Sequence, residues 1–84
     1  MTRDELEIRI LTFLRESLMV GADVRIDRET SLLESGIIDS YTMASINDYL
    51  AKDLGIGIPP DELLPENYAT IAAIANLALR YGRP

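Results

Sequence analysis

Three segments of the sequence space their apolar residues with the 3.6-residue period of an α-helix, and this pattern constrains the fold most strongly. The first helix should run from about Arg3 to Leu18, behind a capping box of the form T-x-x-E that opens at Thr2. The second should start at Ser40, after the N-cap Asp39, and the third should follow the cap Thr70. The predicted fold class is therefore all-α.

Glycine and proline divide the chain between these helices. Gly55 and Gly57 stop the second helix, and the prolines between positions 59 and 65 confine any helix there to about one turn. The segment from Gly21 to Asp39 has no clear period, which indicates a long ordered loop of a kind that tends to be functional. Its apolar anchors are Ile26, Leu32, Leu33 and Ile37. We predict a four-helix bundle of three main helices and one short helix, with this loop between the first two.

Length and composition limit the class of protein. With 84 residues the chain has room for one core, so residues 1–84 should form a single domain. The chain has no Cys and no His, which excludes disulfides, thiolate chemistry and a Ser-His-Asp triad built from this chain alone. We therefore expect neither a metal site nor catalytic activity.

The charge balance indicates which partners to expect. Fourteen acidic and eight basic side chains give a net charge of -6, which disfavours binding to nucleic acid and to anionic membranes. The longest uncharged run, Asn67 to Leu79, is shorter than the roughly 20 apolar residues that a membrane-spanning helix needs. We expect a cytoplasmic monomer whose partners are proteins.

The beginning of the predicted second helix is the candidate site. Ser40 lies on the first turn of that helix, directly after the acidic cap Asp39. Backbone N–H groups point outward there and the helix dipole is positive, so a phosphate ester on Ser40 would lie in a favourable field. The alternative is that Ser40 is only a second capping residue beside Asp39.

This segment resembles the signature of the acyl carrier protein family, in which an Asp-Ser pair opens the second helix. The match is Leu33-x-x-Gly36-x-x-Asp39-Ser40, and an Ile-Pro pair at 58–59 stands at a matching distance beyond the serine. The order of helices is similar over almost the whole chain. The resemblance implies that a phosphopantetheinyl transferase moves the 4′-phosphopantetheine arm of coenzyme A onto Ser40, with Asp39 as helix cap and recognition residue. The arm would then hold an acyl or aminoacyl cargo as a thioester.

The outward face of the predicted second helix carries the residues that partner enzymes would recognise. These residues are Tyr41, Ala44, Ser45 and Asp48. An aromatic residue at Tyr41, where many family members have Leu, is similar to D-alanyl and other aminoacyl carriers. Asp48 is offset by Lys52, whereas fatty acid synthase carriers usually place several acids on this face.

These departures favour a discrete carrier of acyl or aminoacyl intermediates in a specialised pathway, more similar to stand-alone aminoacyl or peptidyl carriers than to the fatty acid synthase carrier. Its partners would be an acyl- or aminoacyl-loading enzyme and the biosynthetic enzymes that follow it. Two alternatives stay open. The chain could be the general fatty acid synthase carrier, or it could be a helical protein-interaction module in which Ser40 is unmodified.

Two further predictions concern polar groups near the core. Asn47 shares a face with the apolar residues of the second helix, and an unpaired amide there would cost about 1 to 3 kcal/mol. We expect it to bond to the long loop or to a buried water, or alternatively to the arm or its cargo. The four tyrosines do not fall on one stripe, so we expect them at core edges and on the surface. They are Tyr41, Tyr49, Tyr68 and Tyr81.

Overall fold

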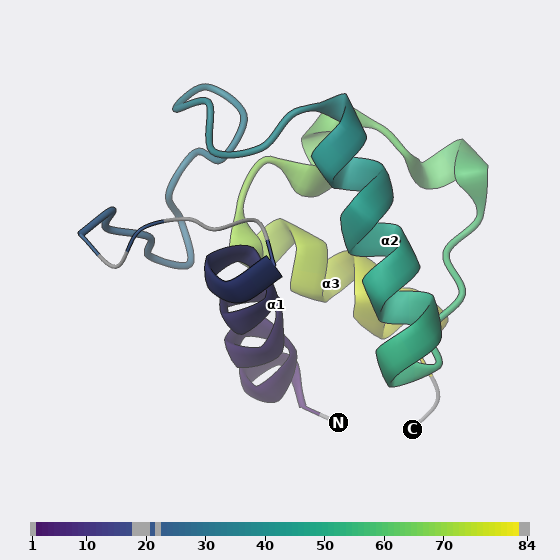
Figure 1. Cartoon of the computed structure of the whole chain (residues 1–84). Helices are drawn as coiled ribbons and strands as arrows, with labels where there is room; N and C mark the ends of the chain where they lie inside the picture. Colours follow the sequence, from purple (N-terminus) through teal and green to yellow (C-terminus); the bar gives the residue numbers. More distant parts are fainter. Residues whose placement is uncertain (1, 18–20, 22, 83–84) are drawn as a thin grey trace.

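The computed structural model describes residues 2–17, 21 and 23–82, and these form three α-helices and two 3-10 turns (Figure 1). The elements in chain order are α1 (Arg3–Ser17), α2 (Ser40–Leu54), η1 (Pro60–Glu62), η2 (Pro65–Tyr68) and α3 (Ile71–Tyr81). The predicted all-α class is confirmed. In place of one short helix the chain makes two 3-10 turns, each of which begins at a proline. The predicted last residue of the first helix, Leu18, lies outside the described residues.

Each α-helix begins at the cap that the sequence predicts. Thr2 and Glu5 form a reciprocal capping box: the Glu5 N–H donates to Thr2 Oγ1 at 3.2 Å and the Thr2 N–H donates to Glu5 Oε1 at 3.3 Å. Asp39 caps α2, and Thr70 accepts the backbone N–H of the residue three positions on at 3.0 Å. Gly55 ends α2 with a φ of 69°, a left-handed conformation that glycine adopts without a steric penalty.

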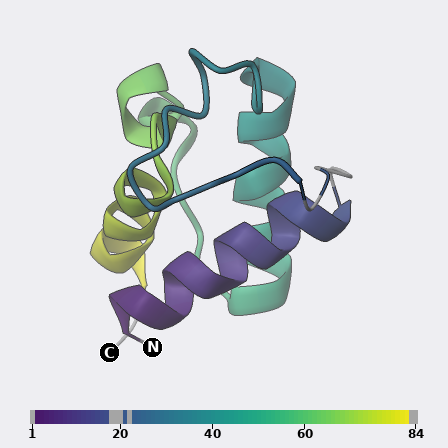
Figure 2. The ribbon, with the colours of Figure 1, turned by 90° about the vertical axis from the view of Figure 1, so that its left-hand side faces the viewer.

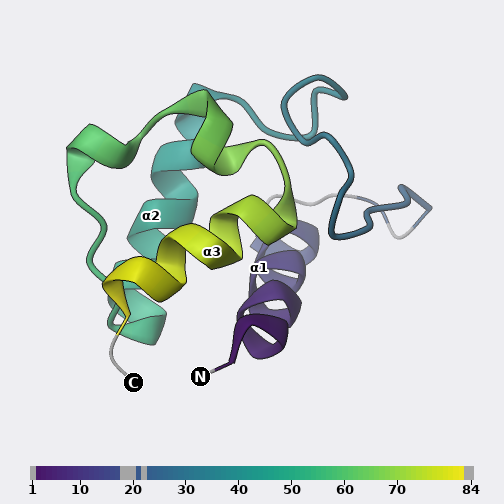
Figure 3. The same cartoon turned by 180° about the vertical axis from the view of Figure 1, so that it is seen from behind.

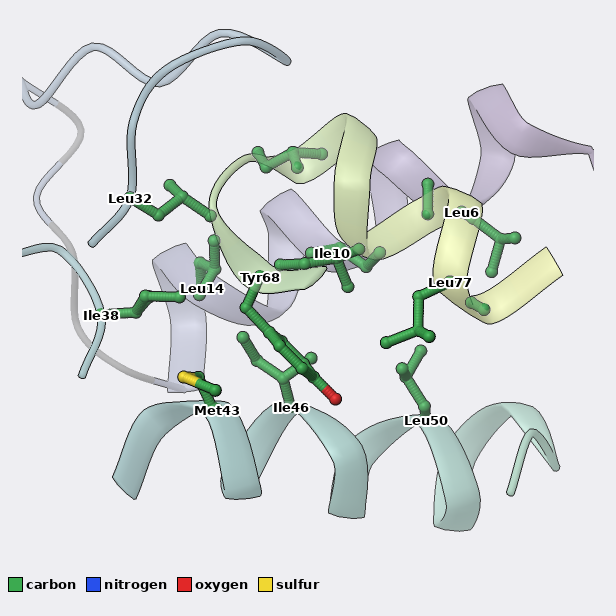
Figure 4. Packing of buried hydrophobic residues seen from close by; sticks show 14 of the residues in the cluster. Leu6, Ile10, Leu14, Leu32, Ile38, Met43, Ile46, Leu50, Tyr68 and Leu77 are labelled. Carbon is green, nitrogen blue, oxygen red and sulfur yellow. The ribbon is translucent and has the colours of Figure 1, made fainter. Parts of the chain in front are cut away.

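One core gathers side chains from the three helices, the long loop and η2 (Figure 4). Its largest fully buried members are Tyr68, Leu6, Ile10, Leu14, Leu32, Ile46, Leu50, Ile71, Ile74 and Leu77. Figure 3 shows α3 lying across α1 and α2. The prediction that all four tyrosines lie at edges or on the surface is wrong for Tyr68, whose ring is fully buried because η2 turns it into the space beside α2. Among the described residues, no helix is both long and apolar enough to cross a bilayer.

The long loop is anchored and leads the chain to the start of α2 (Figure 2). The Leu32 N–H donates to the carbonyl of Ala69 at 2.8 Å, and the Ala72 N–H donates to the carbonyl of Arg28 at 3.0 Å. Leu32 is fully buried, and Ile26 is nearly so. Gly36 turns the chain with a φ of 80°, which explains a glycine at this position. These anchors hold the residues before Ser40 in one place.

An ion pair fastens the loop to α1. The Arg28 Nε donates to Glu7 Oε1 at 3.0 Å and its Nη2 donates to Glu7 Oε2 at 2.9 Å. The Glu7 side chain is only 12% exposed, so solvent screens this bidentate pair less than an ordinary surface pair. The Arg28 hydrogen bond holds the pKa of Glu7 below its usual value near 4.5.

Replacing this carboxylate should produce a pH-dependent loss of stability. A carboxylate with a lowered folded-state pKa stabilises the fold above its unfolded-state pKa, and that contribution is lost as the pH falls through the folded-state pKa. Glu7→Gln should therefore lower the free energy of unfolding most at neutral pH, with a difference from wild type that shrinks below about pH 4.5. Urea unfolding at a series of pH values measures this difference.

The control variant is Glu29→Gln. Its carboxylate makes one 3.3 Å bond to Arg28 and its side chain is 70% exposed, so the loss should be smaller at every pH. A Glu7→Gln difference that does not change with pH would contradict a role for the charge.

Candidate functional site

Ser40 is the first residue of α2 and is exposed where the long loop meets the helix. The preceding Asp39 has extended backbone angles, with φ at -137° and ψ at -171°. The backbone N–H and the hydroxyl of Thr42 each donate to Asp39 Oδ1 at 2.9 Å. These bonds, led by the backbone one, lower the pKa of Asp39 from its usual value near 3.8. The residue before Ser40 therefore carries a negative charge at neutral pH.

The capping function at this helix end belongs to Asp39. Its side chain accepts the Thr42 N–H and its carbonyl accepts the Met43 N–H at 2.9 Å. Among the hydrogen bonds of the described residues, none involves the Ser40 hydroxyl. The alternative in which Ser40 serves as a second cap therefore has no hydrogen bond to support it, and the hydroxyl is accessible for chemistry.

A groove of about 700 Å³ lies between α1 and α2, and its lining includes Tyr41, the residue after Ser40. All four residues that the sequence predicts for partner recognition line this groove: Tyr41, Ala44, Ser45 and Asp48. The α2 side is completed by Tyr49, Lys52 and Asp53. The α1 side consists of Thr12, Phe13, Glu16 and Ser17. The predicted recognition face is thus one wall of a groove.

Sequence reasoning missed the opposite wall. The rings of Phe13 and Tyr49 stack with their centroids 4.5 Å apart and their planes at 23°, which joins α1 to α2 at the groove. In the sequence, Phe13 is one of the apolar residues that recur with helical spacing in the first helix. Its pairing with a residue 36 positions away leaves no periodic signal.

The charges along the groove are unevenly balanced. Lys52 Nζ lies 3.3 Å from Asp48 Oδ2, so these two charges offset each other. Glu16 and Asp53 also line the groove, and within the described part of the chain neither has an ion-pair partner. At the end nearest Ser40, Tyr41 is 79% exposed. The groove therefore combines aromatic surface with a local excess of negative charge.

Asn47 lies on the inner side of α2 and binds a residue that we did not predict. The Tyr68 hydroxyl donates to Asn47 Oδ1, so the amide oxygen pairs with η2 and not with the long loop. Burial raises the pKa of Tyr68, so the phenol stays protonated and acts as the donor. This hydrogen bond connects the middle of α2 to η2.

Comparison with known proteins decides the family. The family described as "phosphopantetheine attachment site" matches residues 9–78, a range that includes Ser40 and both walls of the groove. The chain belongs to this family. Its prosthetic group is therefore 4′-phosphopantetheine, as the resemblance to acyl carrier proteins implies.

Two individual proteins are similar to this carrier. "Probable acyl carrier protein PigG" from a Serratia species is 27% identical over 75 residues, which cover 89% of this chain and 86% of that protein. A chain in a solved structure titled "Crystal structure of FAD-dependent dehydrogenase" is 33% identical with a TM-score of 0.71. That alignment covers 82% of this chain and 97% of the other. The carrier is therefore similar in sequence and fold to chains of about its own length.

The residues at the start of α2 fit the prosthetic group. A phosphodiester needs an exposed hydroxyl, and the first position of a long α-helix places that hydroxyl in the positive field of the helix dipole. Ser40 meets both conditions. The bound arm supplies a thiol that carries cargo as a thioester.

Proposed function

We propose that Ser40 is the attachment residue of the phosphopantetheine arm, and that the protein is a carrier of acyl or aminoacyl intermediates for a specialised biosynthetic pathway. The observation that supports this most strongly is the exposed Ser40 hydroxyl on the first turn of α2, within the range that matches the phosphopantetheine family. In this proposal residues 1–84 act as one carrier domain, as a cytoplasmic monomer that itself catalyses no reaction.

Attachment would need little from the carrier beyond presentation of the serine. Transfer forms a bond between Ser40 Oγ and the pantetheine-side phosphorus of the coenzyme A diphosphate. The P–O bond within the diphosphate breaks, adenosine 3′,5′-bisphosphate leaves, and the hydroxyl proton passes to a base. The chain has no His to accept that proton, so the transferase would supply the base. We assign Asp39 to recognition by the transferase, because its carboxylate is ionised and exposed next to Ser40. Asp39 Oδ1 accepts both Thr42 bonds, which leaves the second oxygen for a metal ion held by the transferase.

Mass spectrometry tests the attachment. Purified protein incubated with coenzyme A and a broad-specificity phosphopantetheinyl transferase should gain the mass of one phosphopantetheine group. Fragmentation should localise the added mass to the peptide that contains Ser40. An unchanged mass with several different transferases would overturn the proposal and favour an unmodified helical interaction module.

Recognition by partner enzymes would use the α2 wall of the groove. We assign this role to Tyr41, Ala44, Ser45 and Asp48. Tyr41 is the most exposed of the large apolar side chains among the described residues, and Asp48 is paired with Lys52, so these four residues offer aromatic contact and little net charge. A fatty acid synthase enzyme that recognises an acidic second helix would bind this surface poorly. This favours a specialised pathway.

Salt should therefore have little effect on transfer to the cognate enzyme. α2 carries two acids and one base, whereas the negative charge lies mainly in the loop before it. We expect the rate of cargo transfer to the carrier's own pathway enzyme to change by less than about fivefold across a salt series, the equivalent of one surface ion pair. A fatty acid synthase enzyme should serve this carrier poorly. Efficient cargo transfer by the synthase enzyme, at a rate that falls steeply as salt is added, would contradict the assignment.

We also infer that a FAD-dependent dehydrogenase is among the downstream partners, because a chain in a structure of that title is 33% identical to this carrier. In such a step the carrier-bound cargo loses two electrons and two protons as a double bond forms, and FAD is reduced to FADH2. Mixing the loaded carrier with a FAD-dependent dehydrogenase should bleach the flavin absorbance and lower the cargo mass by two hydrogen atoms. The unloaded carrier is the control. Flavin that stays oxidised with every cargo tested would argue against this partner.

A further inference from the structure

The Asp39 carboxylate is held by two hydrogen bonds from one residue. The backbone N–H and the side-chain hydroxyl of Thr42 both donate to Asp39 Oδ1 at 2.9 Å. The N–H bond is the ordinary one between a helix cap and the third residue of the helix. α3 begins with that bond alone, since Ala73 at the same position has no side-chain donor. The Thr42 hydroxyl thus adds a contact that capping itself does not need.

The position of Thr42 explains why its hydroxyl turns to the cap. Serine and threonine hydroxyls within helices usually donate to the carbonyl four residues earlier. Thr12 and Ser45 do so in this chain, at 2.8 Å and 3.2 Å. Four residues before Thr42 stands Ile38, which precedes the helix. The hydroxyl donates to the Asp39 carboxylate instead.

The backbone of Asp39 is fixed on both sides. Its carbonyl accepts the Met43 N–H at 2.9 Å, and the N–H of the buried Ile38 donates to the Leu32 carbonyl at 3.0 Å. The side-chain torsions are then the main freedom left to the carboxylate, and the last of them has a broad, roughly two-fold profile in aspartate. Two bonds to one oxygen restrict this torsion more than one bond would. Since both Thr42 bonds end on Oδ1, neither occupies Oδ2.

A partner that reaches Ser40 would meet Asp39 first. Asp39 and Ser40 are exposed, whereas Thr42 is only partly exposed. We propose that Thr42 is a positioning residue for attachment of the arm, whose hydroxyl orients the Asp39 carboxylate so that Oδ2 meets a cation of the transferase, either its metal ion or a basic side chain. This inference rests on the proposed attachment at Ser40. A carboxylate that is oriented in advance loses less side-chain entropy when the transferase binds.

Equilibrium binding measures this role without the reaction. A Ser40→Ala carrier cannot be loaded, so calorimetry can give its dissociation constant for a phosphopantetheinyl transferase supplied with coenzyme A and Mg²⁺. Adding Thr42→Val, which removes the hydroxyl at nearly constant volume, should weaken binding about three- to tenfold, the cost of ordering one side chain. Adding Thr42→Ser, which keeps a hydroxyl, should leave binding unchanged.

Repeating the titrations without Mg²⁺ identifies the cation. The difference made by Thr42→Val should disappear if Oδ2 meets the metal ion, and it should persist if Oδ2 meets a basic side chain.

Thr2→Val is the matched control. It makes the same substitution at the cap of α1, where the hydroxyl accepts the Glu5 N–H and donates to the Glu5 carboxylate, so it should lower stability at least as much as Thr42→Val. The start of α1 and the start of α2 lie at opposite ends of the molecule (Figure 1, Figure 3), so transferase binding should not change. Equal weakening by both variants would show a general loss of stability and overturn the positioning role.

A double-variant cycle with Asp39→Asn shows whether Thr42 acts through Asp39. Asparagine keeps the acceptor oxygen without the charge, so Thr42→Val should have no further effect on binding in that background. A full loss there would mean that Thr42 contacts the transferase itself. That result, or unchanged binding of Thr42→Val beside an intact Asp39, would overturn the inference. Neither result affects attachment at Ser40, which fails only if the wild-type protein gains no phosphopantetheine with several transferases.

Discussion

Ser40→Ala should abolish phosphopantetheine loading completely while leaving the fold intact. The reason for the loss is chemical: alanine has no hydroxyl to form the phosphodiester. The reason for the intact fold is structural, because Ser40 is exposed and Asp39 provides the helix cap. A change to alanine at an exposed helical position should alter the free energy of unfolding by no more than about 0.5 kcal/mol. Intact-protein mass measures loading, and urea unfolding measures stability.

A serine outside the site provides the control. Ser35→Ala removes an exposed hydroxyl that bonds to the carbonyl of Ser31, and this variant should load like wild type. Loading of Ser40→Ala to any substantial extent would contradict attachment at Ser40, whatever the state of the fold.

Two substitutions at Asp39 separate its capping role from its charge. Asp39→Asn keeps a side-chain acceptor for the Thr42 N–H, so stability should change little, but loading should slow because the carboxylate is gone. Asp39→Ala removes both the charge and the side-chain acceptor. It should therefore slow loading and also lower the free energy of unfolding by about 1 kcal/mol. Equal loading rates for wild type and Asp39→Asn would show that the transferase does not use the charge.

Asn47→Leu should destabilise the fold by about 1 to 3 kcal/mol, because it leaves the buried Tyr68 hydroxyl without an acceptor. This is a large part of the roughly 5 to 15 kcal/mol that a small domain has in total. Tyr68→Phe should have a smaller effect, since Asn47 is only partly buried and its amide can turn to water. The double variant should recover part of the loss, because no orphaned hydroxyl remains. Urea unfolding of the four proteins gives the coupling free energy.

A control variant and a measurement of thioester hydrolysis distinguish a structural role of Asn47 from a role in cargo binding. Asn76→Leu places the same change on an exposed position of α3 and should leave stability nearly unchanged. Loaded Asn47→Leu that is still folded should hydrolyse its thioester at the wild-type rate, because Asn47 pairs with Tyr68. Faster hydrolysis in the folded variant would support the alternative in which the Asn47 amide contacts the arm or its cargo. A coupling free energy of zero would contradict the hydrogen bond.

Much of the fold was accessible from the sequence because helix signals are local. The capping box at Thr2, the caps Asp39 and Thr70 and the stop at Gly55 each depend on residues within a few positions. The apolar period then identifies the buried face of each helix. The same local chemistry placed Ser40 on the first turn of α2. The short region after α2 was predicted less well. Proline excludes a regular helix there, but it does not determine which turns form instead.

The remaining features join residues that are far apart in the chain. Tyr68 meets Asn47 and Arg28 meets Glu7 across 21 positions each, and Phe13 stacks on Tyr49 across a still longer separation. No periodic pattern encodes such pairs, since they depend on the angle at which two helices pack and on where a loop is anchored. The α2 wall of the groove could therefore be predicted as an exposed helix face. Its α1 wall, which includes Glu16, exists only because the core brings the two helices side by side.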